Sequence, residues 1–301
     1  MPHFSKVAVF AKPQENVRAI FRKLIEVIVQ SGATPILDRA LEMFFPNGCP
    51  FEMADAAELG KMAEVAVVLG GDGTMLGAGR LLAPYDVPVI GVNAGRLGFI
   101  TDIVHEEMET TLSAMLAGHY VRDERPMLQG RVTRDGETVC SEVAVNDIGL
   151  THGRALGMVE YTVYVDGEPI AVQRADGVLV SSSTGSTAYA MAAGGPILHP
   201  AVRSMLIVPV APHTLSNRPL IISSQSIVDI EVNETRSAVA SFDAQVNFDV
   251  RVGDILRIKI SGQTFTMLHP EGFSYFELLR RKLKWNYLPQ SERPIHTPEA
   301  S

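Results

Sequence analysis

A run of apolar residues from Val65 to Leu69 leads directly into the segment Gly70-Gly71-Asp72-Gly73-Thr74, and a helical pattern over residues 75–83 follows. An all-apolar run of this length is typical of a strand in a parallel sheet that helices cover on both faces. A glycine-rich break after such a strand lies at the carboxyl edge of the sheet, where open α/β folds bind their ligands. The sequence therefore predicts an α/β fold with Asp72 at its binding edge.

The rest of the first third repeats this alternation of short apolar runs and helical patterns. Further strands are predicted at 7–10, 35–37 and 87–92, and helices at 17–28, 54–63 and 105–118. Strands that alternate with helices are the signature of βαβ units. We therefore expect an open, mostly parallel sheet in the N-terminal part of the chain.

Beyond about residue 125 the pattern changes to short strands separated by turns. Asp135-Gly136 and Asp166-Gly167 each lie between β-prone segments, and Asp-Gly suits a type I′ hairpin turn because both central residues need positive φ. Further strands are predicted at 178–182, 205–210, 219–222, 227–232, 239–243, 255–260 and 264–268. This part is predicted to be an all-β, antiparallel, sandwich-like domain.

These patterns divide the chain into two domains. Residues 1–124 form the α/β domain, joined by a return segment at 274–290 in which Tyr275, Leu278 and Leu279 share one helical face. Residues 125–273 form the β domain, and the polar residues 291–301 are predicted to be a disordered tail.

The composition of the chain argues against several kinds of binding partner and metal site. The 301 residues carry 34 acidic and 26 basic side chains, a net charge of −8, which argues against nucleic acid or an anionic membrane as a partner. Two cysteines far apart indicate neither a disulfide framework nor a zinc site. Since no apolar run approaches the roughly 20 residues of a membrane span or resembles a signal peptide, we expect a cytoplasmic protein.

The glycine-rich loop indicates phosphate chemistry. Its glycines let backbone amides approach a phosphate chain, and a carboxylate there would serve as a metal ligand or as the acceptor of a hydroxyl proton. The alternative is a turn in which Asp72 caps the helix. Gly60-Lys61 lacks the rest of a Walker A loop, and the segment after Gly71 lacks the dinucleotide fingerprint.

Three further segments offer polar groups for a nucleotide. The first runs from Arg174 and Asp176 to the hydroxyl-rich residues 181–189, where Tyr189 offers a ring to a base; a surface loop is the alternative. The others, Asn146-Asp147 and Asp243-Ala244-Gln245, are each also compatible with a plain turn. The prolines beside them indicate that His199, His213 and His269 are loop or core residues.

Taken in order, these segments resemble the bacterial NAD kinase family. The resemblance covers roughly residues 5–285 and lies in Gly-Gly-Asp-Gly-Thr at 70–74, Asn-Ala-Gly-Arg-Leu-Gly-Phe at 93–99, Asn146-Asp147, Thr-Gly-Ser-Thr-Ala-Tyr at 184–189 with Gly-Gly-Pro-Ile-Leu-His-Pro at 194–200, and Pro-His-Thr-Leu-Ser-Asn-Arg-Pro at 212–219. Phosphofructokinases and lipid kinases share the first motif alone, whereas the ordered set is specific to this family.

The resemblance implies a two-domain NAD kinase-like fold and an ATP-dependent phosphorylation of the 2′-hydroxyl of the adenosine ribose of NAD, which gives NADP. It also implies a divalent cation, Mg²⁺ or Mn²⁺, with no protein metal ligand assigned, and a homodimer or homotetramer. Asp72 would be the catalytic base. The substrate contacts would be Asp72, Gly73, Asn146, Asp147, Arg174, Asp176, Thr187, Ala188, Tyr189, Ala190, Met191, Ala192 and Gln245.

Two departures from the family pattern and two other functions need testing. Ser182-Ser183 stand where the family usually has Thr-Pro, which we expect to loosen that loop, and Gly157 replaces a larger polar contact residue of some members. Arg80 and residues 93–98 are candidates for holding ATP phosphates, with a structural role in the domain interface as the alternative. The competing functions are a lipid or sugar kinase with the same loop, and a non-catalytic NAD(P) sensor.

Overall fold

The computed structural model describes residues 3–95, 98–153, 157–214 and 216–285. The chain forms two compact units, and each is described by itself. Unit 1 comprises Met1–Met75, Val87–Asp123 and Met267–Ser301; unit 2 comprises Leu76–Asp86 and Glu124–Thr266. The predicted tail at 291–301 and the end of the predicted return segment lie outside the described residues.

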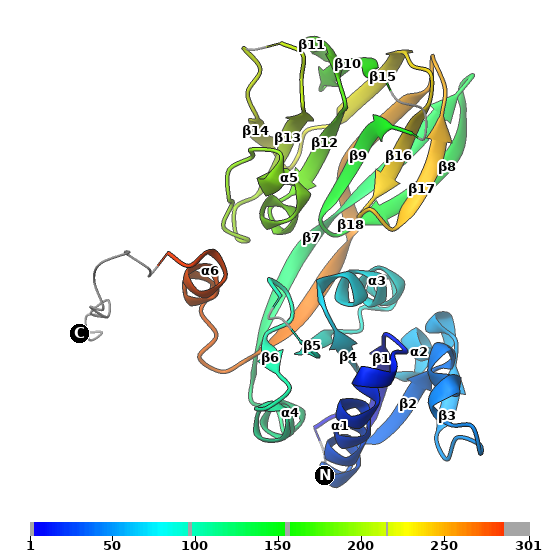
Figure 1. Cartoon of the computed structure of the whole chain (residues 1–301), viewed down its shortest axis with the longest axis vertical. Coiled ribbons are helices and arrows are strands. Elements are labelled where there is room, and N and C mark those ends of the chain that lie inside the picture. The colour runs from blue at the N-terminus through cyan, green and yellow to red at the C-terminus, as the bar shows by residue number, and fades with distance from the viewer. Residues whose placement is uncertain (1–2, 96–97, 154–156, 215, 286–301) are drawn as a thin grey trace. The chain divides into compact units, whose positions relative to one another are not determined.

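Unit 1 is built on a parallel sheet, as predicted (Figure 1). Its strands, in spatial order, are β6 (Ile103–Val104), β5 (Val89–Asn93), β4 (Val65–Gly70), β1 (Lys6–Ala11), β2 (Thr34–Asp38) and β3 (Glu52–Ala54). All six pair in parallel, in agreement with the all-apolar composition of the central strands. Its helices are α1 (Arg18–Gln30), α2 (Ala56–Met62), α4 (Met108–Leu116), α6 (Tyr275–Leu283) and the first turn of α3 (Asp72–Leu82).

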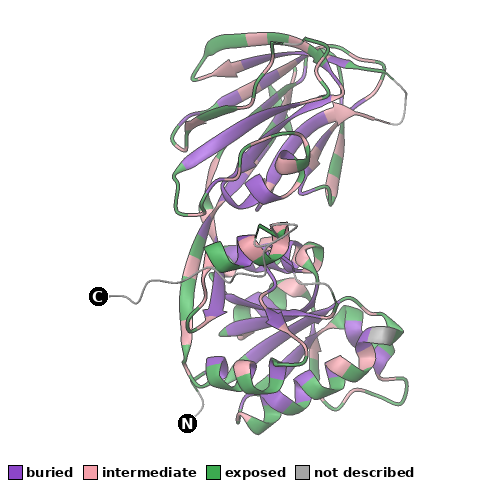
Figure 2. Cartoon of the chain, turned by 60° about the vertical axis from the view of Figure 1, so that its left-hand side comes forward, coloured by how far each residue is buried: buried purple, intermediate pink, exposed green. Residues whose placement is uncertain are grey.

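The core of unit 1 follows from the period of each element. Along β1, Val7 and Val9 face a cluster that includes Phe21, Leu24 and Ile28 of α1. These helical residues are three or four positions apart and therefore share one face. Figure 2 shows the result, with buried strands in purple and the outer faces of the helices in green. In α6, Leu278 and Leu279 are buried, whereas Tyr275 is only partly buried.

Unit 2 is an antiparallel β-sandwich, which confirms the predicted fold class. One sheet has the order β11-β10-β15-β18, with β7 and β8 attached, and the other has the order β14-β13-β12-β9-β16-β17. The strands are β7 (Tyr120–Arg134), β8 (Glu137–Ala144), β9 (Asp147–His152), β10 (Val159–Val165), β11 (Glu168–Ala175), β12 (Gly177–Ser182), β13 (Ser204–Val210), β14 (Leu220–Ser223), β15 (Val228–Glu234), β16 (Ala238–Phe242), β17 (Val246–Val250) and β18 (Ile255–Pro270).

The predicted Asp-Gly turns are present, since Asp135, Gly136, Asp166 and Gly167 all have positive φ. One prediction was wrong: the strands expected at 255–260 and 264–268 are a single strand, β18. Its first part pairs with β15 in unit 2, and Met267 pairs with Val89 in unit 1. The polar residues 261–263 are therefore part of the strand rather than a turn.

Candidate active site

Asp72 lies at the carboxyl edge of the unit 1 sheet, where the sequence places it. Strand β4 ends at Gly70, which is paired with Asn93 at the end of β5. The loops after both strands therefore emerge at the same edge. The helix α3 begins at Asp72, three residues earlier than predicted, so the carboxylate belongs to the first helical turn.

The loop after β5 holds the Asp72 carboxylate. Oδ2 accepts a hydrogen bond from the Phe99 amide at 2.8 Å, and Oδ1 accepts from the Ile100 amide at 3.2 Å and from the Thr101 hydroxyl at 3.3 Å. Gly98 permits this approach, because a Cβ at that position would overlap Oδ1. The carboxylate is therefore oriented by two backbone amides and one hydroxyl of residues 99–101.

A carboxylate offers about four acceptor positions, and these contacts occupy three of them. Oδ1 takes two hydrogen bonds and Oδ2 takes one. Thr101 is itself oriented by the buried Asn93, whose Nδ2 donates to Thr101 Oγ1 at 2.9 Å. Oδ2 is thus the oxygen with capacity to accept a proton from a bound hydroxyl.

In unit 2, the structure brings Asp147, Asp176 and Tyr189 together on one cavity of about 300 Å³. The same cavity is lined by Gly149, Thr151, His152, Leu179, Val210, Ser241 and Ala244. Tyr189 is 46% exposed, so its ring is available to a ligand. A cavity with two carboxylates and one aromatic ring suits a group that carries both hydroxyls and a base.

Asp147 is buried beside a second carboxylate, that of Asp243. Burial, and secondarily the charge of Asp243, raise the pKa of Asp147 to about 7. Burial also raises the pKa of Asp243, against the opposing effects of three backbone N–H donors and Arg80. Asp147 is therefore the member of the pair that we expect to change its protonation state near neutral pH.

Arg174 lies on a different cavity, of about 510 Å³, with Gly157, Met158, Glu160, His213, Glu234, Thr235 and Arg236. Arg174 belongs to β11, whereas Asp176 lies between the end of β11 and the start of β12, and the two residues line different cavities. His213, expected to be a loop or core residue, also lines this cavity, whereas the buried His269 belongs to the core of unit 1 as expected.

The segment from Thr187 to Ala192 begins at the last residue of a 3₁₀ turn (Thr184–Thr187) and ends with α5 (Tyr189–Ala192). The Thr187 hydroxyl donates to the Thr184 carbonyl, and Ala190 is fully buried. Ala188 and Met191 are partly buried, and Ala192 is exposed. The segment thus offers the Tyr189 ring and its backbone to a ligand more readily than its hydroxyls.

The two serines that depart from the family pattern anchor their loop. The Ser182 hydroxyl donates to the Val145 carbonyl at 2.6 Å and accepts from the Gly185 amide, and the Ser183 hydroxyl donates to the Pro200 carbonyl. Gly185 lies so close to the Asn146 carbonyl that a Cβ would overlap it. These contacts do not fit the loosening that we expected.

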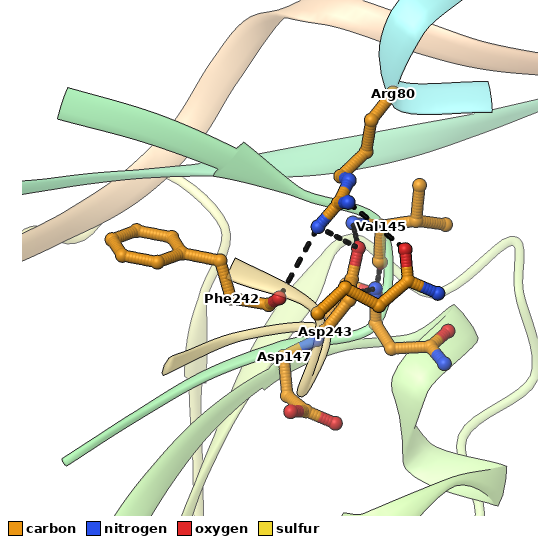
Figure 3. Close-up of polar contacts among 8 residues, drawn as sticks. Arg80, Val145, Asp147, Phe242 and Asp243 are labelled. Carbon is orange, nitrogen blue, oxygen red and sulfur yellow. Dashed lines mark hydrogen bonds and ion pairs between the residues drawn. The ribbon is translucent and has the colours of Figure 1, made fainter. Parts of the chain in front are cut away.

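Arg80 makes its polar contacts with the turn between β16 and β17, which belongs to the same unit. Its guanidinium donates to the Phe242 carbonyl and to Gln245 Oε1, and it lies 3.8 Å from Asp243 Oδ2 (Figure 3). From the sequence, Asp243 was predicted only as part of a segment that could contact a nucleotide or form a plain turn. The signal that marks it is the hairpin position between two strands, because both Asp243 and Ala244 have positive φ.

Within the described parts of the chain, no three His, Cys, Asp or Glu side chains converge as a metal site. Asp72 is a single carboxylate whose acceptor positions are mostly occupied. The described side chains therefore do not fit a protein-held cation. No described helix is long and apolar enough to cross a membrane.

The parallel α/β unit with its Gly-Gly-Asp-Gly loop, together with the antiparallel sandwich and its polar cavity, has the architecture of the two-domain nucleotide-dependent kinases. Residues 11–120 match the family model of the ATP-NAD kinase N-terminal domain, and residues 145–269 match that of the C-terminal domain. The chain belongs to the NAD kinase family.

Relatives and solved structures agree with this assignment. The NAD kinase of Ralstonia nicotianae is 49% identical over 285 residues, which cover 93% of this chain and 92% of the relative. The NAD kinase of Polaromonas naphthalenivorans is 51% identical over 232 residues, 77% of this chain and 80% of the relative. A yeast NADH kinase solved with NADH has the same fold, with a TM-score of 0.87 at 22% identity over 97% of this chain and 90% of that one. An NAD kinase from Archaeoglobus fulgidus solved with ATP gives a TM-score of 0.73 at 23% identity, over 93% and 98% of the two chains.

Proposed function

We propose that this enzyme transfers the terminal phosphoryl group of ATP to the 2′-hydroxyl of the adenosine ribose of NAD, with Asp72 as the general base. The observation that carries the proposal is the fixed Asp72 carboxylate, held by residues 99–101 with capacity left on Oδ2. Phosphoryl transfer depends mainly on positioning and on charge stabilisation, so one well-placed carboxylate is sufficient on the protein side. The proton of the attacking hydroxyl would pass to Oδ2.

The residues of unit 2 would bind the dinucleotide. Asp147 and Asp176 offer acceptors to hydroxyl and amino groups, and Tyr189 offers its ring to a base. Arg174 supplies positive charge on the other cavity. Gly73, Asn146, Gln245 and the remaining residues of the segment from Thr187 to Ala192 complete the proposed contact set.

The cation would enter with ATP. Mg²⁺ or Mn²⁺ bound to the phosphates supplies charge neutralisation in phosphoryl transfer, and the described side chains form no separate cation site. On the family resemblance we also propose a homodimer or homotetramer. On the net charge and the lack of a long apolar run we propose a cytoplasmic protein with neither nucleic acid nor membrane as a partner. The domain limits at 124 and 273 likewise remain predictions.

The direct test is an assay of purified protein with ATP, Mg²⁺ and either NAD or NADH, in which NADP or NADPH is measured with a dehydrogenase specific for the phosphorylated cofactor. We expect product from NAD. Phosphorylation of a diacylglycerol or a sugar phosphate instead would favour the competing kinase functions. Tight NADP binding without any product would favour the sensor.

A further inference from the structure

The turn between β16 and β17 holds the backbone of the proposed dinucleotide-binding residues Asn146 and Asp147. Asp243, the first residue of this turn, accepts hydrogen bonds from the amides of Val145 at 2.9 Å, Asn146 at 2.7 Å and Asp147 at 3.3 Å. The Asp243 amide donates in return to the Asp147 carbonyl at 3.0 Å. One carboxylate thus satisfies three consecutive backbone donors and fixes the chain at the start of β9.

This arrangement buries the negative charge of the Asp243 carboxylate, and a buried charge must be offset by a cation or by hydrogen-bond donors. The Asp243 side chain is fully buried, burial raises its pKa, and its charge in turn contributes to the raised pKa of the nearby Asp147 carboxyl. Burying two carboxylates is unfavourable unless a cation or hydrogen-bond donors offset their charge. The Asp243 carboxylate therefore depends on the groups that surround the turn.

Arg80 is the cation at this turn. Its side chain is only 14% exposed, and Nη1 lies 3.2 Å from the Phe242 carbonyl and 3.8 Å from Asp243 Oδ2. Nη2 donates to Gln245 Oε1 at 2.9 Å. The planar guanidinium thus lies against Phe242, Asp243 and Gln245 with its N–H donors in a fixed fork, a geometry that an ammonium group does not have.

Figure 3 shows that Arg80 and the Asp147 carboxylate lie on different sides of the turn. The guanidinium reaches the turn from helix α3, whereas the Asp147 carboxylate points away from it. Arg80 is not among the residues that line the cavity of Asp147 and Asp176. Its influence on that cavity must therefore pass through Asp243 and Gln245.

We propose that Arg80 is a positioning residue for NAD binding, which orients Gln245 directly and Asn146 and Asp147 through Asp243. The proposal rests on the function proposed above. In this role Arg80 acts on the binding of the acceptor substrate rather than on the binding of ATP. Its loss should therefore weaken NAD binding selectively, since Gln245 and the start of β9 would lose their fixed orientation.

The test compares Arg80→Met and Arg80→Lys with wild type in steady-state kinetics, with NAD and ATP varied separately. We expect Arg80→Met to raise KM for NAD about 10-fold, the effect of losing charge-assisted hydrogen bonds, and to leave KM for ATP within about twofold. Arg80→Lys keeps the positive charge but lacks the planar donor geometry of the guanidinium, so its KM for NAD should lie between those of wild type and Arg80→Met. The exposed Arg22, on α1, gives the matched control Arg22→Met, for which we expect wild-type constants.

A double-mutant cycle separates positioning from general destabilisation. If Arg80 acts through Gln245, the variant carrying both Arg80→Met and Gln245→Ala should raise KM for NAD by clearly less than the product of the two single effects. If Arg80→Met does not fold, as judged by circular dichroism, the same cycle is measured with Arg80→Lys.

Three results would overturn the proposal: KM for NAD within about twofold of wild type in the folded Arg80 variant, an equal rise in KM for both substrates, or fully multiplicative effects in the cycle. A wild-type protein that forms no NADP would instead overturn the proposed function, so the two failures are distinguishable.

Discussion

Two aspartates of this enzyme have the same side chain and opposite surroundings. Asp72, at the edge of a sheet, accepts hydrogen bonds from two backbone amides and one hydroxyl. Asp147 is buried with a second carboxylate nearby, and its pKa is raised to about 7. The environment, rather than the residue type, therefore distinguishes the proposed proton acceptor in unit 1 from the proposed ligand contact in unit 2.

The raised pKa of Asp147 makes a prediction about stability. In the unfolded chain this carboxyl ionises near pH 4, whereas in the native state it stays protonated up to about pH 7. The wild type therefore loses stability between these values as pH rises, and Asp147→Asn does not. Relative to wild type, the variant should gain about 2 kcal/mol between pH 5 and pH 8 in urea unfolding. A stability difference that is constant with pH would contradict the assigned shift.

The residue scale also shows what the sequence left out. Asp72, Asn146 and Asp147 could be singled out because their motifs are contiguous. The contacts of Asp243, of Arg80 and of the residues that hold Asp72 could not be predicted, since they join segments 27 to 165 positions apart. Long-range hydrogen bonds of this kind leave no local pattern in a single sequence.

At the scale of elements, apolar runs and Asp-Gly turns were sufficient to predict most strands. The exceptions are instructive. The polar residues 261–263 indicated a turn inside β18, but strand pairing on both sides overrides local composition. The helix α3 begins at Asp72 despite the glycines around it, because an acidic residue is favoured in the first turn of a helix.

His269 joins three elements of unit 1. The imidazole, which lies near the end of β18, bonds to Asp102 through Nδ1 and to Asp123 of β7 through Nε2 at 3.1 Å, and it stacks on Phe273. Burial alone would lower its pKa, but the two carboxylates raise it to about 8. Asp102 follows directly after the residues that hold Asp72, so this cluster supports the proposed catalytic loop.

The stability that His269 contributes should depend on pH. It is fully present below the unfolded pKa of about 6.5 and is lost as pH rises through about 8, because only the protonated ring gains from both carboxylates. His269→Gln should cost about 2 kcal/mol more at pH 6 than at pH 9. The exposed His119 provides the control His119→Gln, with little change at either pH. An equal cost of His269→Gln at both pH values would contradict the ion-pair assignment.

At the scale of the whole molecule, the two fold classes predicted from the sequence are those of the two units. The sequence predicted an α/β unit and an antiparallel sandwich, and both are present because each has its own hydrophobic periodicity. The division of α3 and β18 between the two units was not predicted. Periodicity describes one element at a time and carries no information on which unit the element joins.

The net charge of −8 has a consequence for catalysis. An acidic protein that binds two anionic substrates needs positive charge in its site, and among the described residues no three His, Cys, Asp or Glu side chains are grouped so that they could hold a metal ion. The cation bound to ATP should therefore be essential. We expect EDTA in excess over Mg²⁺ to abolish NADP formation and added Mg²⁺ to restore it, while circular dichroism shows an unchanged fold. Undiminished turnover in EDTA would rule out this dependence.

The central claim is that the Asp72 carboxylate accepts the proton of the attacking hydroxyl. The most direct test is the rate of NADP formation by purified Asp72→Asn beside wild type, at saturating ATP, Mg²⁺ and NAD. We predict a kcat at least about 100-fold lower, the usual effect of removing a general base, with a thermal unfolding midpoint close to that of wild type. A folded Asp72→Asn variant with near-normal kcat would contradict the account.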